Sequence, residues 1–579
     1  MDKENYKISN NTSHKKNNLI IFSIVSFFAI QYIAFISFFK VNFPYSSDFP
    51  DIIFFTYDFI KLGEINLLEP ISGHFFVFPR LISFVNLYFN SFDVNNIFYL
   101  QWVVISLTVF LMYLLLKQTD KKLSWVIIPI SAFLYCPLAS SNYFIPAMLA
   151  WLLPTISITT MIFVLNKRPS FKNTVYGISL AIFSTLSTVI GVIAWIPGLI
   201  MNQKKKWFVI WVLSMIIFGL YYLSIIPEDE NEIHPELLFS YEGYAFIATF
   251  LSTPFRLKYD FLMVIIGSLS IFISLFCLYY FLKIEREFKT VLPWFTFILV
   301  AFVGAIITAL GRIHLEGHFG DEPYYITVSQ LFQIGLLVLI SKIMINTRKN
   351  SKRKIFTIFL ISIIIIQMVL LVPSYYSGWV RGEYYMNEKM DQVNCLSLSP
   401  DETCISLITN HYQDPYYQKF YEMINFWIEN DLSIFSEINF NRVNQSAIDE
   451  YPLFSEKILI SNYGAITKIN NLEYNQDLEY LLDTPFLLIE GWMLDFEMQQ
   501  LDSIYLLKND EPLAKITTFE STIQQTSGIK INSDLKPSWK IFIMSGYIDY
   551  GCHEMSIVGI KNMEKNYLSD EFTLCKYNP

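Results

Sequence analysis

Long apolar stretches recur through the first two thirds of this chain, and their length limits the folds open to it. A helix needs about 20 mainly apolar residues to cross the hydrocarbon core of a membrane. Charged residues make up only 16% of the 579 residues, below the share of about 25% in soluble domains. The sequence therefore predicts a polytopic α-helical membrane protein. The candidate spans are 18–40, 96–116, 124–141, 146–166, 174–189, 190–202, 207–226, 260–284, 291–311, 325–345 and 355–373.

Basic clusters between these stretches predict the side of the membrane on which each loop lies, because Lys and Arg favour the cytoplasmic side. All clusters lie on that side only if residues 174–202 cross twice, as two short helices. A single crossing would place Lys204 and the clusters after it on the extracytoplasmic side. The split predicts about eleven spans, a cytoplasmic N-terminus and an extracytoplasmic C-terminal region. The clusters are Lys15/Lys16, Lys117/Lys121/Lys122, Lys167/Arg168/Lys172, Lys204/Lys205/Lys206, Lys283/Arg286/Lys289 and Arg348/Lys349/Lys352/Arg353/Lys354.

The predicted first outer loop, residues 41–95, is longer, more acidic and more aromatic than a connector requires. A carboxylate at a membrane surface can act as a general base toward an acceptor hydroxyl, and Asp48 fits that role. A phosphate leaving group needs cationic or hydrogen-bonding partners. Residues of the predicted outer segments that fit this second role are His74, Arg80, Arg256, Lys258 and Arg312.

Each of these residues also fits a plain structural role when it is taken alone. An Asp is commonly a helix cap, and Arg80 after Pro79 suits a headgroup anchor at a helix end. A single His such as His74 is more often an interfacial or hydrogen-bonded residue than a catalytic one. Their joint placement on one predicted face of the membrane favours a shared site.

The last two hundred residues are typical of a water-soluble region. Residues 374–455 carry mainly helical patterning, and residues 456–579 show short alternating runs separated by turns such as KNDEP. That pattern predicts a β-sandwich. The predicted organisation is a membrane domain over 1–373, a helical linker region over 374–455 and a β-sandwich domain over 456–579.

The six cysteines divide between the spans and the outer region. Cys136 and Cys277 lie in predicted spans, and the other four lie in the predicted outer region, where an oxidising compartment permits disulfides. Pairing by nearness in sequence joins Cys395 to Cys404 and Cys552 to Cys575, but four cysteines allow three connectivities. The cysteine and histidine spacing matches no zinc site, and the sequence identifies no cofactor and leaves a requirement for a divalent cation open. The net charge of −9 does not suggest nucleic-acid binding.

The run SGHFFVFPRL resembles the first outer loop of the bacterial GT-C-type integral membrane glycosyltransferases. That family commonly carries Asn-Glu-His-Arg followed shortly by Pro-Arg-Leu, and His74 and Arg80 occupy the matching positions. An acidic residue follows the family's first span, which corresponds to Asp48, with Asp51 as the second candidate. Gly73 and Phe75 stand where the family carries Glu and Arg, which leaves more of the phosphate-binding role to Arg80 and Arg312.

Three later segments carry the same resemblance. STVIGVIAWIPGLI resembles the family's short paired spans with a glycine near their tip, and ALGRIHLEG resembles its Gly-Arg motif at an outer helix end, here Arg312. The family's later Arg-Tyr pair is replaced by Tyr324 and Tyr325. The stretch from SGWVRGEYY to the GWMLD and GCHEMSIVGI runs resembles the soluble region and β-sandwich appended in one subgroup.

The resemblance implies transfer of a hexose or pentose from a polyprenyl-phosphate donor, approached from the lipid bilayer, to an extracytoplasmic glycan acceptor such as O-antigen, capsule or another surface polysaccharide. The implied reaction is a single inverting displacement at the outer face of the bacterial inner (cytoplasmic) membrane. Asp48 would be the base, the basic residues would bind the donor phosphate, and the β-sandwich would bind or orient the acceptor glycan.

Three other functions compete with this interpretation. The nearest alternative is a surface-polysaccharide polymerase or ligase, which also uses basic outer loops. A lipid-glycan transporter would need ionisable residues along its path, and the predicted spans contain few. A non-catalytic anchor would not need about eleven spans.

Overall fold

The computed structural model describes two compact units, Met1–Asn387 and Glu388–Pro579. The described residues are 2–43, 55, 57–58, 61, 67–68, 74–139, 149–167, 170–202, 204–225, 235–257, 259–313, 320, 322, 325–348, 354–398, 422–424, 426–427, 459–461, 464–469, 472–473, 479–481, 486–493, 503–509, 511–516, 538–544, 551–561 and 564–576.

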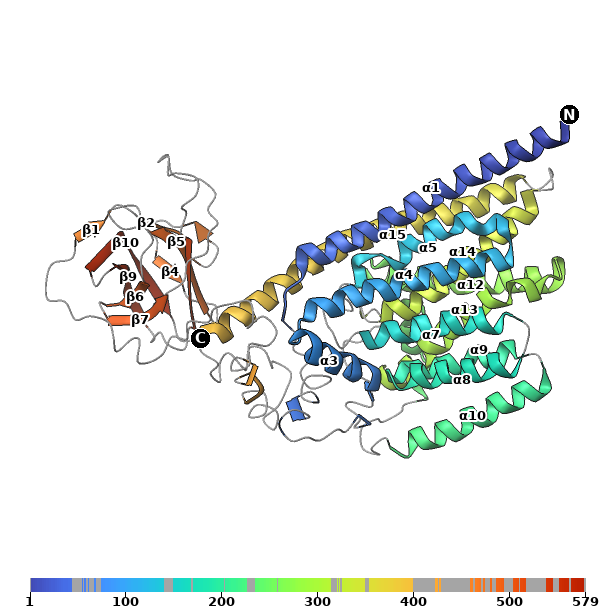
Figure 1. Ribbon diagram of the computed structural model, residues 1–579, viewed down its shortest axis with the longest axis horizontal. Coiled ribbons are helices and arrows are strands. Elements are labelled where there is room, and N and C mark those ends of the chain that lie inside the picture. Colours follow the sequence, from blue (N-terminus) through green and yellow to red (C-terminus); the bar gives the residue numbers. More distant parts are fainter. Residues whose placement is uncertain are drawn as a thin grey trace. The chain divides into compact units, whose positions relative to one another are not determined.

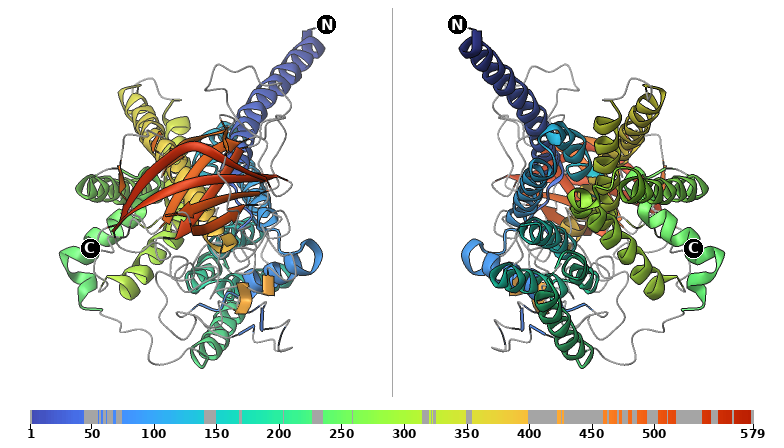
Figure 2. Two further views of the ribbon diagram at one scale, coloured as in Figure 1. Left: turned by 90° about the vertical axis from the view of Figure 1, so that its left-hand side faces the viewer. Right: turned by 90° about the vertical axis from the view of Figure 1, so that its right-hand side faces the viewer.

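The first unit is a bundle of helices that lie side by side (Figure 1) and are seen end-on in Figure 2. Among the described residues, eight helical segments are long and apolar enough to cross a membrane, which confirms the polytopic helical class. They are α1 (Asp2–Phe39), α4 (Val94–Thr119), the run of η2 (Lys121–Val126), α5 (Ile127–Leu134) and η3 (Pro137–Ala139), α10 (Lys205–Leu223), α12 (Asp260–Tyr279) with η9 (Tyr280–Ile284), α13 (Phe288–Arg312), α14 (Ile326–Arg348) and α15 (Lys354–Leu398).

The other three predicted spans coincide with shorter helices. These are α7 (Leu149–Leu165), α8 (Phe171–Thr185) and the pair η5 (Val189–Trp195) and α9 (Ile196–Met201). Residues 171–201 do not form one helix, because the chain turns back at 186–188. Thr174 near the start of α8 lies beside Asn202 just after α9, with 3.5 Å between their side-chain oxygens. This is the predicted antiparallel pair, which we call the short hairpin; the total of eleven spans stays a prediction.

Helix α14 lies at the centre of the bundle, with both faces buried. Its amides reach neighbouring backbones, since Gln330 donates to the carbonyl of Phe133 at 2.6 Å and Gln333 to that of Leu251 at 2.8 Å. Near its other end, Lys342 pairs with Asp120 at 2.9 Å. Polar groups inside an apolar bundle need such partners, so these bonds fix the position of α14.

Helix α15 continues past residue 373, where the sequence placed the end of the membrane domain, as far as Leu398. It runs beside α1 through a cluster of aromatic rings, in which the centroids of Phe35 and Trp379 lie 5.4 Å apart. Gly382 allows this close approach, because a Cβ there would lie 2.8 Å from the Phe35 ring. The domain boundary predicted at 373 therefore falls inside a continuous helix.

Shorter helical elements connect the long ones. Helix α3 (Val77–Asn90) follows the first loop, and η7 (Leu237–Phe239), α11 (Tyr241–Ser252) and η8 (Thr253–Phe255) precede α12. Residues 238–255 mix Glu, Ser and Thr with Phe, Tyr and Leu, a composition that predicts an interfacial helix rather than a span. The twelve residues of α11 are too few to span a bilayer, and one face of α11 is buried against its neighbours.

The second unit contains two β-sheets. One has the strand order β1-β10-β9-β6-β7, with β4 also paired to β10, and the other has the order β3-β2-β5-β8. The strands are β1 (Leu459–Ser461), β2 (Gly464–Ile469), β3 (Leu472–Glu473), β4 (Glu479–Leu481), β5 (Phe486–Met493), β6 (Ser503–Lys508), β7 (Glu511–Ile516), β8 (Ser538–Met544), β9 (Gly551–Lys561) and β10 (Glu564–Lys576). The predicted GIKIN strand, 528–532, lies outside the described residues.

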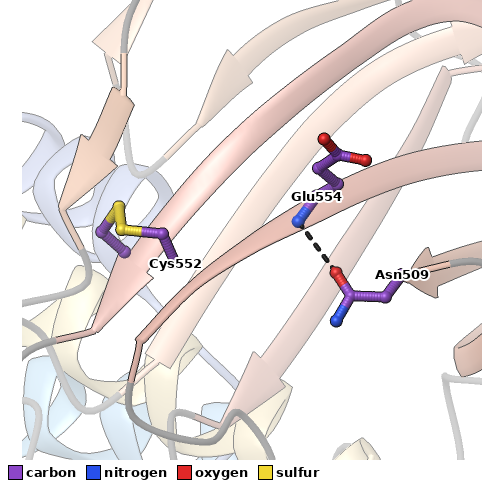
Figure 3. Close-up of a disulfide and its surroundings, with 4 residues drawn as sticks. Asn509, Cys552 and Glu554 are labelled. Carbon is purple, nitrogen blue, oxygen red and sulfur yellow. Dashed lines mark hydrogen bonds between the residues drawn. A yellow bond between two sulfur atoms is a disulfide. The ribbon is translucent and has the colours of Figure 1, made fainter.

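One disulfide joins the open ends of the β9–β10 hairpin, between Cys552 and Cys575 (Figure 3). The two residues face each other in the antiparallel register, so the sequence-nearest pairing is confirmed here. Nearby, Asn509 turns the chain from β6 to β7 at φ 48°, and its Oδ1 accepts the Glu554 N–H at 3.0 Å. Asn tolerates this left-handed conformation well, which explains the predicted KNDEP turn.

Candidate functional site

His74 links the loop between α1 and α3, the predicted first outer loop, to the tip of the short hairpin. Its side chain is 8% exposed, and its Nδ1 lies 3.0 Å from the Thr188 hydroxyl oxygen. The Val189 N–H donates to the same nitrogen at 3.3 Å. A backbone N–H can only donate, so Nδ1 is an acceptor and the proton of the neutral ring lies on Nε2. Among the described residues, Nε2 makes no hydrogen bond.

The surroundings of His74 keep its ring neutral. Burial, and secondly the positive charge of Arg312, lower the pKa of His74 from 6.5 to about 4. At neutral pH the side chain is therefore a hydrogen-bond donor without charge. Of the two forms of the predicted role, a cationic or a hydrogen-bonding partner, a neutral His74 fits only the hydrogen-bonding one.

The backbone beside His74 is strained in a way that the hairpin stabilises. Phe76, the N-cap of α3, has φ 46° and ψ 26°, a left-handed conformation that is unusual for a bulky residue. Its neighbour Val77 donates its N–H to the carbonyl of Leu186 at 2.9 Å. Such strain costs on the order of 1–3 kcal/mol and persists where surrounding contacts hold it. The segment from His74 to Val77 thus docks on the hairpin tip through both side chain and backbone.

Close packing between the two limbs makes the hairpin tip rigid. A Cβ at Gly191 would lie 1.9 Å from the carbonyl oxygen of Ser184, so only glycine fits this position. The Ser184 hydroxyl donates to the Gly191 carbonyl at 3.1 Å, and Trp195 Nε1 donates to the Thr185 hydroxyl at 3.2 Å. Close contact with Ser184 therefore explains the glycine at position 191, which resembles the family's tip glycine.

Arg312 brings a fixed positive charge to the same place. It lies in the last turn of α13, is half-buried, and acts electrostatically on the His74 ring. Gly320, which lies between α13 and α14 in the sequence, contacts the helical elements before α12. Gly320 has φ +76°, and its carbonyl accepts the Thr253 hydroxyl at 3.1 Å. The structure thus brings together two of the predicted site residues, His74 and Arg312, from segments far apart in the sequence.

Arg80 is held inside the first loop. Its side chain is 1% exposed, its Nη1 donates to the Leu67 carbonyl at 3.3 Å, and its guanidinium lies 5.7 Å from the ring centroid of Phe55. These contacts fold the loop against α3. Arg256 follows η8 and is half-buried at the start of the segment that leads into α12. The remaining predicted site residues, Asp48, Asp51 and Lys258, lie outside the described residues.

Two groups at this site escaped the sequence analysis. Thr188 and Val189 provide the atoms that orient His74, and the only local signal was the polar run STLST inside an apolar stretch. Trp151, at the start of α7, lies with its ring centroid 6.3 Å from that of His74 and 6.0 Å from that of Tyr325. Nothing in the sequence around Trp151 distinguishes it from the other aromatic residues of the spans.

The arrangement suits the binding of an anionic oxygen. A neutral N–H donor and a guanidinium charge, supplied by a loop and by a helix end, are the kind of groups that stabilise a phosphate. Within the described part of the chain, no group of three or more His, Cys, Asp or Glu residues has the placement of a metal site. No family model matches the chain, and neither does any curated protein or solved structure.

Proposed function

We propose that this protein is a membrane glycosyltransferase that moves a sugar from a polyprenyl-phosphate donor to an extracytoplasmic glycan acceptor. The observation that carries the proposal is the convergence of His74 and Arg312 at the tip of the short hairpin. In the GT-C-type enzymes that the sequence resembles, the matching motifs serve the lipid-phosphate donor. Their meeting in space is what one shared donor site requires.

The proposed reaction is a single inverting displacement. The acceptor hydroxyl oxygen forms a bond to the anomeric carbon while the bond from that carbon to the phosphate oxygen breaks. Asp48, with Asp51 as the second candidate, takes the hydroxyl proton, and the lipid phosphate leaves as an anion. Base and leaving group then lie on opposite faces of the sugar, as in inverting hydrolysis.

The described residues divide the work of stabilising the departing phosphate. Arg312 supplies the charge, and the Nε2–H of His74 supplies a neutral hydrogen bond. Arg80, whose Nη1 donates to the Leu67 carbonyl, has further N–H groups and remains a proposed phosphate ligand in the loop that carries the base. Arg256 and Lys258 remain proposed phosphate ligands from the segment before α12.

The topology that we propose places this site below the outer surface of the membrane. The two limbs of the short hairpin are each about 23 Å long, less than the hydrocarbon core of about 30 Å. With Ser170 and Lys204 at the cytoplasmic face, the tip therefore ends inside the outer leaflet. Irregular backbone at that depth is tolerated where it lines a cavity within the protein. A lipid-linked phosphate approaching from the bilayer would meet the site at this level.

The two sheets of the C-terminal unit complete the proposal. They contact each other through β10 with β2 and through β7 with β8, which suits a β-sandwich. We assign this region to binding or orienting the acceptor glycan. With the positive clusters on the cytoplasmic side, it lies outside the bacterial inner membrane, in a compartment that permits the disulfide between Cys552 and Cys575.

The glycan profile of a strain lacking the gene tests the proposal. Loss of one sugar substituent, restored by the wild-type gene and not by Asp48→Asn, is the expected result. Asp58→Asn, a change of the same kind in the same loop, is the matched control and should restore the substituent. Shortened polysaccharide chains in place of a missing sugar would instead favour the polymerase, and an Asp48→Asn strain with a full profile would refute the assigned base.

A further inference from the structure

Two neighbouring residues near the proposed site, Thr188 and Val189, act on the same ring nitrogen, Nδ1 of His74. We propose that Thr188 and Val189 are positioning residues, which hold His74 as the neutral Nε2–H tautomer so that Nε2 donates to an anionic oxygen of the bound substrate. The identity of that substrate rests on the proposed function. The tautomer of His74, and its dependence on Thr188 and Val189, do not.

Thr188 and Val189 both act on the lone pair of Nδ1. Val189 presents a backbone N–H to Nδ1 at 3.3 Å, and the Thr188 hydroxyl lies 3.0 Å from the same atom. Protonation of Nδ1 would set its new N–H against the N–H of Val189, which cannot accept, and would force the Thr188 hydroxyl to turn from donor to acceptor. The hairpin tip therefore opposes the imidazolium form through geometry as well as through burial.

Two aromatic rings restrict rotation of the His74 ring. Its centroid lies 5.2 Å from that of Phe76 and 6.3 Å from that of Trp151. The hairpin tip is also held to the backbone beside His74, because the Val77 N–H donates to the Leu186 carbonyl at 2.9 Å. A flip that exchanged Nδ1 and Nε2 would give up both hydrogen bonds to the tip.

One charged group and several neutral ones surround the His74 ring. Among the described residues, Arg312 is the charged group that acts on its ring. The other contacts come from Thr188, Val189, Phe76 and Trp151, and none of these titrates near neutral pH. A neutral imidazole beside Arg312 avoids like-charge repulsion, and it donates a hydrogen bond without losing its proton. The phosphate would thus leave as an anion that is stabilised but not protonated by His74.

Nuclear magnetic resonance of the full-length protein in nanodiscs, labelled with 15N-histidine, tests the tautomer directly. The chain has seven histidines, and a His74→Gln variant assigns the signal by its disappearance. We expect a neutral Nε2–H ring that persists at pH 5.5. An Nδ1–H ring, or an imidazolium at that pH, would overturn the inference whatever the enzyme activity.

Substitutions at the hairpin tip separate positioning from simple support of the fold. Thr188→Val removes the hydroxyl at nearly constant volume, and the titration midpoint of His74 should rise by about 0.7 of a pH unit, the size that one neutral hydrogen bond corresponds to. Thr188→Ser, which keeps the hydroxyl, should have the wild-type midpoint. Ser187→Ala removes the neighbouring hydroxyl, which bonds the carbonyl of Phe183 instead, and should leave the midpoint unchanged.

The same variants, assayed for sugar transfer, separate this inference from the proposed function. The acid limb of the pH–rate profile should move with the midpoint in Thr188→Val and return in Thr188→Ser. An unchanged midpoint in Thr188→Val would overturn the positioning role. The expected resonances together with no turnover of any polyprenyl-phosphate sugar would leave the positioning role intact and refute the transferase.

Discussion

Val189 donates its backbone N–H to Nδ1 of His74 across 3.3 Å, although the two residues are 115 positions apart. This hydrogen bond closes the first outer loop onto the short hairpin. It also fixes which nitrogen of His74 is left to face a ligand. The consequences reach both the stability of the protein and its chemistry.

Lowering the pH should reduce the free energy of unfolding of the bundle, because His74 is protonated more readily in the unfolded state than in the folded state. Above pH 6.5 the ring is neutral in the folded and the unfolded states, so it has no effect. As the pH falls from 6.5 toward about 4, the unfolded state binds a proton that the folded state does not. Between pH 7 and pH 5 the free energy of unfolding should decrease by about 2 kcal/mol from this residue alone.

Unfolding of wild type and His74→Gln in mixed micelles, measured at several pH values, checks this dependence. Other groups titrate as well, so the quantity to compare is the difference between the two proteins. That difference should shrink steadily as the pH is lowered. A difference that stays constant from pH 7 to pH 5 would show that the folded state binds the proton readily, against the burial described above.

The tip of the short hairpin should not tolerate even a methyl side chain at position 191. Gly191→Ala places a Cβ 1.9 Å from the Ser184 carbonyl oxygen, so the two limbs must separate. We expect a loss of about 2 kcal/mol or more, seen as a lower melting temperature. Gly219→Ala on α10 is the control, because a Cβ there meets nothing within 4 Å. Equal melting temperatures for the two variants would contradict the packing of the tip.

The sequence predicted the helices well where the signal was local. The stretch 96–116 became α4, Val94–Thr119, because its apolar length sets the span and Asp93 caps its start. The turn within 174–202 was also predictable, since basic residues at both ends required an even number of crossings. Eight spans follow from length and hydropathy, whereas three helices are too short for either property to identify them as spans.

The candidate site was predictable as a list of residues but not as a geometry. His74 and Arg312 were identified from motifs, yet their proximity depends on packing between elements that share no local pattern. Charge alone suggested the same role for Arg80 and Arg312. The structure gives the two arginines different surroundings: Arg80 bonds the Leu67 carbonyl within its own loop, whereas the charge of Arg312 acts on the His74 ring. For Thr188 and Val189 the only local signal was the polar run STLST, which does not identify them, since Thr188 acts with a common hydroxyl and Val189 with a backbone atom.

The partly buried ion pair between Asp120 and Lys342 should stabilise the folded bundle through coupling between the two side chains. Lys342 Nζ lies 2.9 Å from Asp120 Oδ2 and 4.0 Å from Glu287 Oε2. Asp120→Asn keeps the cap on η2 but leaves the Lys342 charge with Glu287 as its remaining partner, so we expect a loss of about 2 kcal/mol. The double variant Asp120→Asn/Lys342→Met should recover much of that loss.

A double-mutant cycle on melting temperature and unfolding free energy measures this coupling. Lys121→Ala is the control, because Lys121 is exposed on the same turn. A coupling below about 0.5 kcal/mol would mean that the two sites are independent and that the pair does not hold α14 in place.

The disulfide between Cys552 and Cys575 should hold the ends of β9 and β10 together. It closes a loop with a sequence separation of 23, for which chain entropy predicts about 3 kcal/mol of stabilisation. Peptide mapping without reductant should recover the two cysteines in one linked peptide. In Cys552→Ser/Cys575→Ser, hydrogen exchange of the β9 and β10 amides should accelerate, while α14 is unaffected. Recovery of both cysteines as free thiols would contradict the pairing.

Release of polyprenyl phosphate by the purified protein in nanodiscs is the most direct test of the proposed chemistry. Wild-type protein, given a labelled polyprenyl-phosphate sugar and the polysaccharide of its own strain, should transfer the sugar and release the lipid phosphate. Arg312→Ala should slow release by about 100-fold or more while the fold, judged by melting temperature, is kept. Folded wild-type protein that releases no lipid phosphate, or an Arg312→Ala variant as active as wild type, would contradict a donor site at His74 and Arg312.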